Sequence, residues 1–237
     1  MKMLSSLITL ILMALPFGSV SAGQSVNQAM KKIFAETDRS AFSAEIIEKA
    51  INADFNISEP ACRGKQAKVT DAALTYFPIN RKITYEYEYT STDFIGSKRL
   101  LFTIKNYSEK DATASVDVTI IKGNKTSKFY FKMQLKHNGI YSSNSFLSGP
   151  RLEIPSSIYR GKTWIENGNK NWISSIKARI NLPAGKFENC VKIKTKIGNG
   201  DAGEASRYYA KGIGLIYEEW EAEDRSDILK LTSYSIR

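Results

Sequence analysis

The sequence predicts a mainly β protein, a strongly curled antiparallel sheet or partial β-barrel with two short N-terminal helices, and three observations support this fold class. From residue 83 onward, apolar and polar residues alternate with a period of two, as in half-buried strands. Segments rich in Gly, Asn and Asp separate these runs and suit tight turns. Before residue 60 the apolar residues instead recur with a helical period. A meander of this many half-buried strands must curl to bury its apolar face.

The first twenty-two residues are typical of a secretory signal peptide. A Met-Lys-Met start precedes an apolar run from Leu7 to Phe17, and the small residues Val20 and Ala22 favour cleavage after Ala22. The run is shorter than the roughly 20 apolar residues that a membrane-spanning helix needs. We therefore expect export to the periplasm or beyond, with no transmembrane span after cleavage. No Cys follows the cleavage point, which disfavours a lipid anchor.

A helical segment over residues 23–60 is expected to precede the sheet domain over residues 61–237. Ser25 and Gln28 have the spacing of a capping box at the start of the first helix, and the second helix is expected over residues 41–53. No linker rich in Pro, Gly or Ser divides the remainder. The sequence therefore predicts one domain after the helical segment.

Eight or nine substantial strands are expected in that domain. Their apolar sets are Tyr85, Tyr87 and Tyr89; Leu100, Phe102 and Ile104; Val116, Val118 and Ile120; Phe129, Phe131, Met133 and Leu135; Ile176, Ala178, Ile180 and Leu182; Val191, Ile193 and Ile197; and three final strands over residues 204–210, 213–221 and 228–236. The less regular stretch from Asn138 to Lys170 is expected to form short strands and loop along the rim of the sheet.

Lysines fill the polar face of two of these strands. The first row comprises Lys128, Lys132 and Lys136, and the second Lys192, Lys194 and Lys196. Cleavage after Ala22 removes one Lys from 34 basic residues and none of the 24 acidic ones, which leaves a net charge of about +9. The rows are compatible with a solvated face that resists aggregation. They are also compatible with contact to an anionic envelope surface, such as phospholipid headgroups or an acidic glycan. Nucleic acid is disfavoured, because interleaved Arg and aromatic residues are missing.

The aromatic side chains of two strands are candidates for a ligand site. Tyr85, Tyr87 and Tyr89 on one strand, with Phe129 and Phe131 on another, point to the apolar side of the curl. They form either a plain core or the lining of a hollow for a lipidic or other amphiphilic ligand.

Two cysteines, Cys62 and Cys190, would face an oxidising compartment after export. A disulfide between them and a pair of buried free thiols are both compatible with the sequence, because Cys190 lies within an apolar-polar alternation where a thiol packs as a small hydrophobe.

Motifs for catalysis, metal binding and cofactor binding are missing. His137 is the only histidine, the cysteines lack metal-ligand spacing, and neither a G-x-S-x-G nor a phosphate-binding loop is present. We therefore expect no cofactor, no metal and no enzymatic activity. One remote enzymatic alternative stays open, a glycan hydrolase that uses two carboxylates. Its candidates are strand glutamates that we expect to be half exposed: Glu86, Glu88, Glu218, Glu219 and Glu221.

Two hairpin motifs resemble a pattern of uncharacterised exported bacterial proteins and lipoproteins. The first runs from Pro183-Ala184-Gly185 through Phe187 to Cys190, and the second from Tyr208-Tyr209 through Gly212 and Gly214 to Leu215. Tyr76-Phe77-Pro78-Ile79 is similar to the opening of that domain, so the resemblance spans residues 76–221. It implies a curled antiparallel sheet and brings no established activity or site residues.

These observations lead to an exported, non-enzymatic envelope protein, and the main hypothesis is that it binds an amphiphilic ligand in the concave face of the sheet. The alternative is a structural or interaction module of an envelope assembly. A well-filled sheet interior would favour the alternative. The sequence leaves the oligomeric state open.

Overall fold

The computed structural model describes residues 72–198, 203–223 and 225–237. The predicted signal peptide, both predicted helices and Cys62 lie outside these residues. The described elements are the helix α3 (Ala72–Tyr76) and the strands β1 (Ile83–Ser91), β2 (Ser97–Ser108), β3 (Thr113–Lys122), β4 (Lys125–Lys136), β5 (Gly139–Ser142), β6 (Arg151–Pro155), β7 (Thr163–Glu166), β8 (Asn169–Leu182), β9 (Gly185–Ile197), β10 (Gly203–Ala210), β11 (Gly214–Ala222) and β12 (Arg225–Ile236). In this part of the chain, no helix is both long and apolar enough to cross a membrane.

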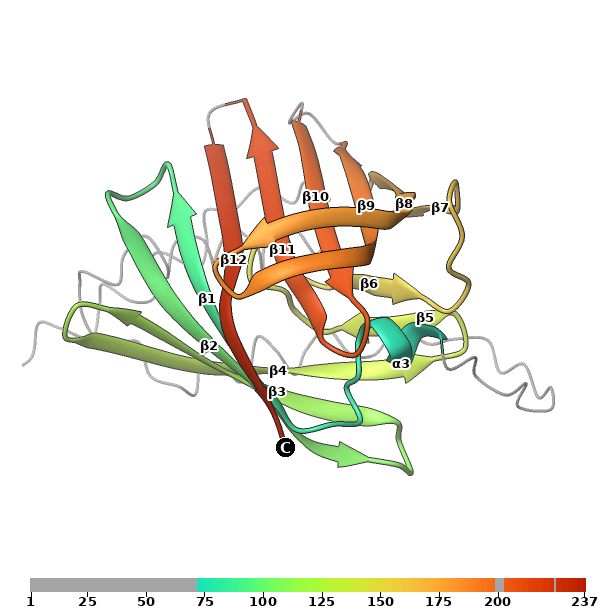
Figure 1. Ribbon diagram of the computed structural model, residues 1–237, viewed down its shortest axis with the longest axis horizontal. Coiled ribbons are helices and arrows are strands. Elements are labelled where there is room, and N and C mark those ends of the chain that lie inside the picture. Colours follow the sequence, from blue (N-terminus) through green and yellow to red (C-terminus); the bar gives the residue numbers. More distant parts are fainter. Residues whose placement is uncertain (1–71, 199–202, 224) are drawn as a thin grey trace, which may run out of the picture.

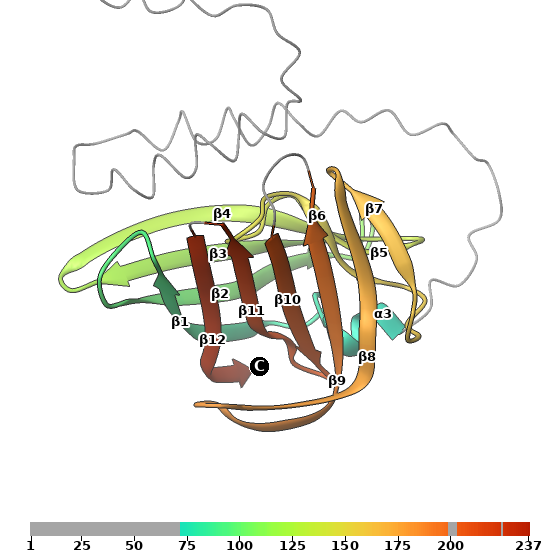
Figure 2. The ribbon, with the colours of Figure 1, turned by 90° about the horizontal axis from the view of Figure 1, so that it is seen from above.

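All twelve strands belong to one antiparallel sheet with the order β6-β5-β4-β3-β2-β1-β12-β11-β10-β9-β8-β7. Apart from the break between β6 and β7, each strand pairs with its neighbours in the chain, and the first strand also pairs with the last. Two six-stranded meanders, β1–β6 and β7–β12, are thus joined through β1 and β12. Figures 1 and 2 show the meanders curling into two walls of a barrel-like sheet. The predicted fold class is confirmed, although the strands number twelve rather than eight or nine.

The two edge strands, β6 and β7, come together through side chains, and we call their contact the seam. The Leu152 N–H donates to both carboxylate oxygens of Glu166, at 2.9 and 2.8 Å. The Asn167 side-chain amide donates to the Pro150 carbonyl at 3.0 Å. Because these bonds replace a backbone ladder, the sheet is nearly but not fully closed. The stretch between Asn138 and Lys170 supplies β5, β6 and β7, so the short strands expected there are confirmed at both edges.

The core lies inside the curl, because the alternation along each strand directs apolar side chains inward. On β1 and on β3, every second residue is buried while the residues between are partly exposed. Burial of a large apolar side chain contributes about 1.5–3 kcal/mol relative to exposure, so these rows account for much of the drive to curl the sheet.

One end of the curl is closed by α3 and by two hairpin turns. The Gly212 N–H donates to the Thr75 carbonyl at 2.7 Å, which fixes the β10–β11 turn on the helix. Gly214 has φ +116°, and a Cβ there would lie 2.8 Å from the ring of Phe77. Glycine at this position therefore admits the Phe77 ring into the core. At the β8–β9 turn, the Ala184 N–H donates to the Leu231 carbonyl at 3.3 Å, beyond the last residue pair of β11 and β12.

Candidate functional site

The predicted tyrosines of β1 lie in the core as a bonded row. Tyr85, Tyr87 and Tyr89 are at most 6% exposed. The Tyr85 hydroxyl donates to the Ile213 carbonyl at 2.5 Å, and the Tyr87 hydroxyl donates to the Leu215 carbonyl at 2.7 Å. Burial raises the pKa of Tyr85 and of Tyr87 well above the ordinary value of a tyrosine. The hydroxyls therefore stay protonated and fasten one wall of the curl to the other.

The hollow beside this row is small. It is lined by Phe77, Tyr85, Tyr87, Phe102, Ile104, Val116, Phe131, Met133, Phe146, Leu215 and Leu229, and on its polar side by Ser145, Arg151, Glu153 and Glu218. The space open to the centre of a water molecule is about 20 Å³, which suits one or two waters. Phe131 lines the hollow, whereas Phe129 is only half-buried and packs at its margin. Packed side chains thus fill the space that a lipid chain would need.

A buried ionic cluster forms the polar side of this hollow. The Arg151 guanidinium on β6 donates to the Glu153 carboxylate at 3.0 Å and to both carboxylate oxygens of Glu218 on β11, one of them at 2.9 Å. The Tyr209 hydroxyl on β10 donates to the other Glu153 oxygen at 2.7 Å. The side chains of Arg151, Glu153 and Glu218 are 8%, 3% and 1% exposed. Four groups from three strands therefore meet inside the curl.

Arg207 on β10 extends the cluster toward the seam. Its guanidinium donates to the Leu152 carbonyl at 3.3 Å and to the Asn171 side-chain oxygen at 3.2 Å, and Thr195 donates to the same oxygen at 2.6 Å. Leu152 on edge strand β6 thus has its N–H bound by Glu166 and its carbonyl bound by Arg207. Side chains from the other meander replace the missing neighbouring strand along this part of β6.

The environment of the cluster favours a structural role over a catalytic one. Burial by itself would lower the pKa of Arg151, but the carboxylates of Glu153 and Glu218 raise it well above its ordinary value. Each carboxylate is occupied by a guanidinium or hydroxyl donor. A general acid or nucleophile needs an accessible carboxyl group beside the substrate. The buried and bonded carboxylates of Glu153 and Glu218 therefore do not favour the glycan hydrolase alternative.

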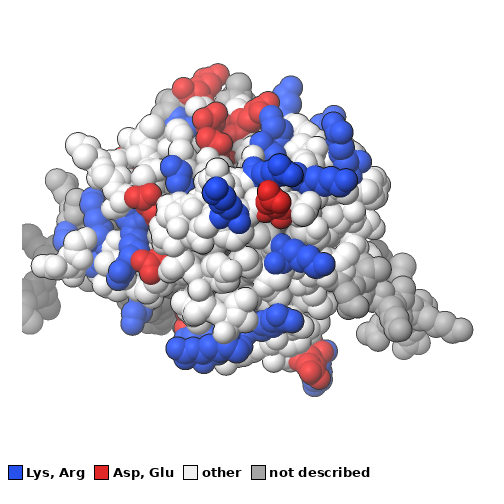
Figure 3. Space-filling view, in the orientation of Figure 1, with Lys and Arg blue, Asp and Glu red and all other residues white. Residues whose placement is uncertain are grey.

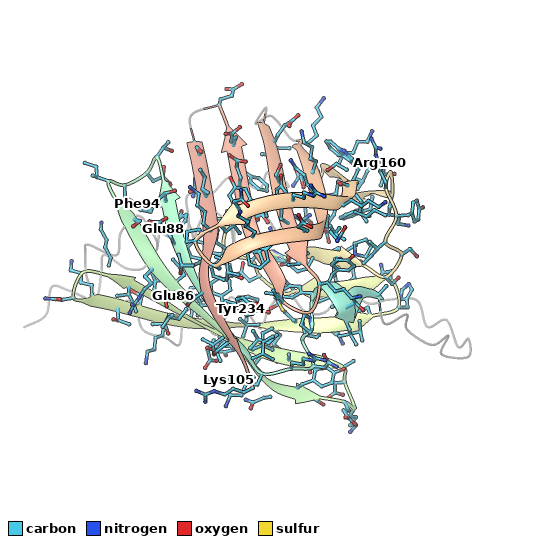
Figure 4. The ribbon with its side chains drawn as sticks, viewed as in Figure 1. Glu86, Glu88, Phe94, Lys105, Arg160 and Tyr234 are labelled. Carbon is cyan, nitrogen blue, oxygen red and sulfur yellow. The ribbon has the colours of Figure 1, made fainter. Side chains whose placement is uncertain are left out.

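The expectation that Glu218 is half exposed is wrong, because its side chain shares the inward phase of β11 with Ile216 and Trp220. The other four glutamates of that set are partly or fully exposed, and Glu86 pairs with Arg99 at 3.6 Å. Figure 4 labels Glu86 and Glu88 along β1. The structure does not bring these candidate carboxylates together.

The lysine row of β4 lies on the outer face of the sheet with few acidic neighbours. Lys128 and Lys132 are exposed, and Lys136 is partly buried with its Nζ 5.2 Å from the ring centre of Tyr141. The facing residues of β3 are Thr119 for Lys128 and Ser115 for Lys132. β3 contributes one acidic residue, Asp117, and its carboxylate accepts a hydrogen bond from Lys105 on β2. The β4 row is therefore a cationic strip.

The lysine row of β9 has partners instead. Lys192 lies 4.9 Å from the ring centre of Tyr208, and Lys194 pairs with Glu204 at 3.3 Å. Lys196 is exposed and stands opposite Glu204 in the ladder between β9 and β10. In the view of Figure 3, basic side chains with a few acidic ones among them lie at the left, and acidic and basic side chains mix over the C-terminal meander.

Cys190 is buried, and burial raises the pKa of its thiol to about 11, which makes the thiol a poor nucleophile. Since Cys62 lies outside the described residues, the pairing of the two cysteines stays a prediction.

His137 is in the turn after β4, as expected. Among the residues that the structure describes, no three His, Cys, Asp or Glu side chains are grouped so that they could hold a metal ion.

No protein-family model and no curated protein sequence matches this chain. Two crystal structures are similar to it. One is a predicted lipoprotein from Parabacteroides distasonis, with 11% identity and a TM-score of 0.44. The other is a predicted exported protein with YmcC-like fold from Bacteroides fragilis, with 12% identity and a TM-score of 0.46. Each alignment covers 65% of this chain and 95% of the other chain.

Proposed function

We propose that this protein is exported and works, without catalysing a reaction, by docking its cationic outer surface on the anionic membrane of the cell envelope. Export rests on the signal peptide predicted over residues 1–22. The observation that carries the docking is the contrast between the two lysine rows. In the β9 row, Lys194 pairs with Glu204 and Lys192 lies against the ring of Tyr208, whereas the strand beside the β4 row carries one acidic residue, Asp117, which already pairs with Lys105.

Two lysines on the outer face of β4 make the docking surface, which we call the β4 strip: Lys128 and Lys132. Both are exposed. A Lys near an anionic lipid surface contributes about 1 kcal/mol, and the contribution decays within a Debye length. A strip of two gives weak, reversible attachment that decreases with salt.

The filled interior argues against the ligand hypothesis. A drug-sized ligand needs a pocket on the order of hundreds of Å³, and the hollow beside Tyr87 has room for one or two waters. A filled interior also suits the alternative, a module that joins a protein assembly in the envelope. The two are separable, because such a module is not retained by lipid alone.

The test is sedimentation of the mature chain, residues 23–237, with vesicles that contain phosphatidylglycerol. We expect retention at low salt, release at high salt and no retention by phosphatidylcholine vesicles. The double variant Lys128→Glu/Lys132→Glu should bind at least about tenfold more weakly, since each reversal removes one attraction and adds a repulsion.

The matched control is Lys192→Glu/Lys194→Glu, which reverses the same charge in the β9 row. It should keep most of the binding of the parent protein. Equal losses in the two double variants would contradict the proposal, as would a parent protein that no anionic vesicle retains.

A further inference from the structure

The turn between β1 and β2 presents an isoleucine with no covering side chain. Ile95 is 99% exposed, the highest value among the large hydrophobic residues that the structure describes as exposed. Removing an apolar side chain such as this one from water is favourable by about 25 cal/mol per Å² of apolar area. A fixed, exposed isoleucine is therefore a candidate contact for an apolar partner.

The ring of Phe94, the residue before Ile95, holds the turn in place. The ring of Phe94 packs edge-on against Tyr89, with 5.2 Å between ring centres, and the Nζ of Lys98 lies 4.2 Å from the Phe94 ring centre. Gly96 takes φ +82°, a conformation that glycine adopts without strain. Phe94 thus anchors the turn to the core while its neighbour Ile95 points away.

Bonds to β12 hold the other side of the turn. The Thr92 N–H donates to the Ser226 carbonyl at 3.0 Å, and the Asp93 carboxylate pairs with Arg225 at 3.4 Å. These contacts hold the chain before Phe94, and the ladder pair of Thr90 and Ser97 closes the turn after it. Ile95 is therefore presented by an ordered turn.

The turn lies next to the tip of the β3–β4 hairpin. The Nζ of Lys122 is 5.8 Å from the ring centre of Phe94, so the tips of the β1–β2 and β3–β4 hairpins are neighbours. Figure 4 labels Phe94 at the upper left of the molecule, at the end of β1 and β2. Lys122 thus belongs to the same end of the molecule as the exposed Ile95.

We propose that this turn inserts into the membrane: Ile95 enters the boundary between headgroups and acyl chains, and Lys122 contacts the lipid phosphates. The inference rests on the proposed function and names the point of insertion. Interfacial anchors combine basic residues with an apolar side chain that enters the boundary, and lysines can place their amines at the headgroups while their methylene chains contact apolar groups. Protein interfaces are instead depleted of lysine, which favours a lipid surface as the occupant.

A tryptophan in place of Ile95 tests the insertion directly. The emission that Ile95→Trp adds to that of the parent protein should shift to shorter wavelength with phosphatidylglycerol vesicles and should be quenched by brominated lipid. The matched control is Ile165→Trp on β7. Ile165 is exposed as well, at 79%, and its ladder partner on β8 is a lysine, Lys170. Its strand β7 lies on the opposite side of the molecule from the β1–β2 turn (Figure 1).

A second measurement uses retention. Ile95→Asp should weaken vesicle binding by about tenfold, and Ile165→Asp should leave it unchanged. Retention of the parent protein without a shift or quenching of the tryptophan at position 95 would overturn the insertion and leave the proposed docking intact. A parent protein that is not retained would overturn both. Because Ile95 packs against nothing, neither replacement should alter folding, and circular dichroism checks this.

Discussion

Two ion pairs of this protein bridge different strands and differ in almost every other respect. Arg151 and Glu218 meet inside the curl, with side chains 8% and 1% exposed, while Lys194 and Glu204 meet on the outer face, with side chains 35% and 62% exposed. Water screens the outer pair, so breaking it costs little. The inner pair has no water to replace a lost partner. Inner charges therefore hold the architecture, and outer charges are available for contacts with other molecules.

The largest expected effect comes from removing the inner cation. Arg151→Met removes the guanidinium bound to the buried Glu218 carboxylate and leaves Glu153 with Tyr209 and, at 3.9 Å, Arg207, so we expect the free energy of unfolding to fall by about 3–5 kcal/mol. Urea denaturation followed by tryptophan fluorescence measures this change.

The control for that prediction removes a second partner. In Arg151→Met/Glu218→Leu, the carboxylate that lost its guanidinium is gone, so the double variant should recover a substantial part of the loss. A double variant as unstable as Arg151→Met would mean that the packing of the arginine, and not its charge, supports the fold.

An intermediate effect is expected at the seam, and it depends on pH. Burial raises the pKa of Glu166 above the ordinary value of a glutamate, so between the two values the folded state binds more protons than the unfolded state. The free energy of unfolding should therefore decrease as pH rises through this window. Glu166→Gln keeps an acceptor for the Leu152 N–H and should flatten that decrease, which denaturation over a pH series measures. The same slope in both proteins would contradict the assignment to Glu166.

The smallest effect is expected on the outer face. Lys194→Ala removes the pair with Glu204, and we expect the free energy of unfolding to change by about 0.5 kcal/mol or less. The same urea titration measures it. A loss that approached that of Arg151→Met would erase the distinction between the two ion pairs.

The regular strands were predictable because apolar and polar residues alternate along each of them without interruption. Tyr85, Tyr87 and Tyr89 are the clearest case, since each inward tyrosine is separated from the next by a glutamate. The short strands around residues 139–166 could be expected only as a region, because each is four or five residues long and offers too few positions to establish a period. In β6, Arg151 and Glu153 alternate with Leu152 and Ile154, but all four are buried, so the polar residues do not mark a solvent face.

The ionic cluster was missed because charge in a strand is usually a sign of exposure. A signal did exist. Glu218 shares its phase with Ile216 and Trp220, and Arg207 shares its phase with Ala205 and Tyr209. A charged residue in the apolar phase of a strand predicts a buried partner of opposite sign. The sequence does not say which strand supplies it, because Arg151 lies 67 residues from Glu218.

The pairing of β1 with β12 also has a consequence for the order of folding. Ile83 is the ladder partner of Ile236 and Ser91 that of Asp227, so the two meanders can be joined only when β12 is available. A chain that emerges from a ribosome or a translocation channel with its N-terminus first can form local hairpins early. It cannot complete this sheet until β12 has emerged. Contacts of such sequence separation are slow to form, and unpaired strand edges invite aggregation in the interval. For this topology, the emergence of β12 therefore sets the moment at which the sheet becomes one folded unit.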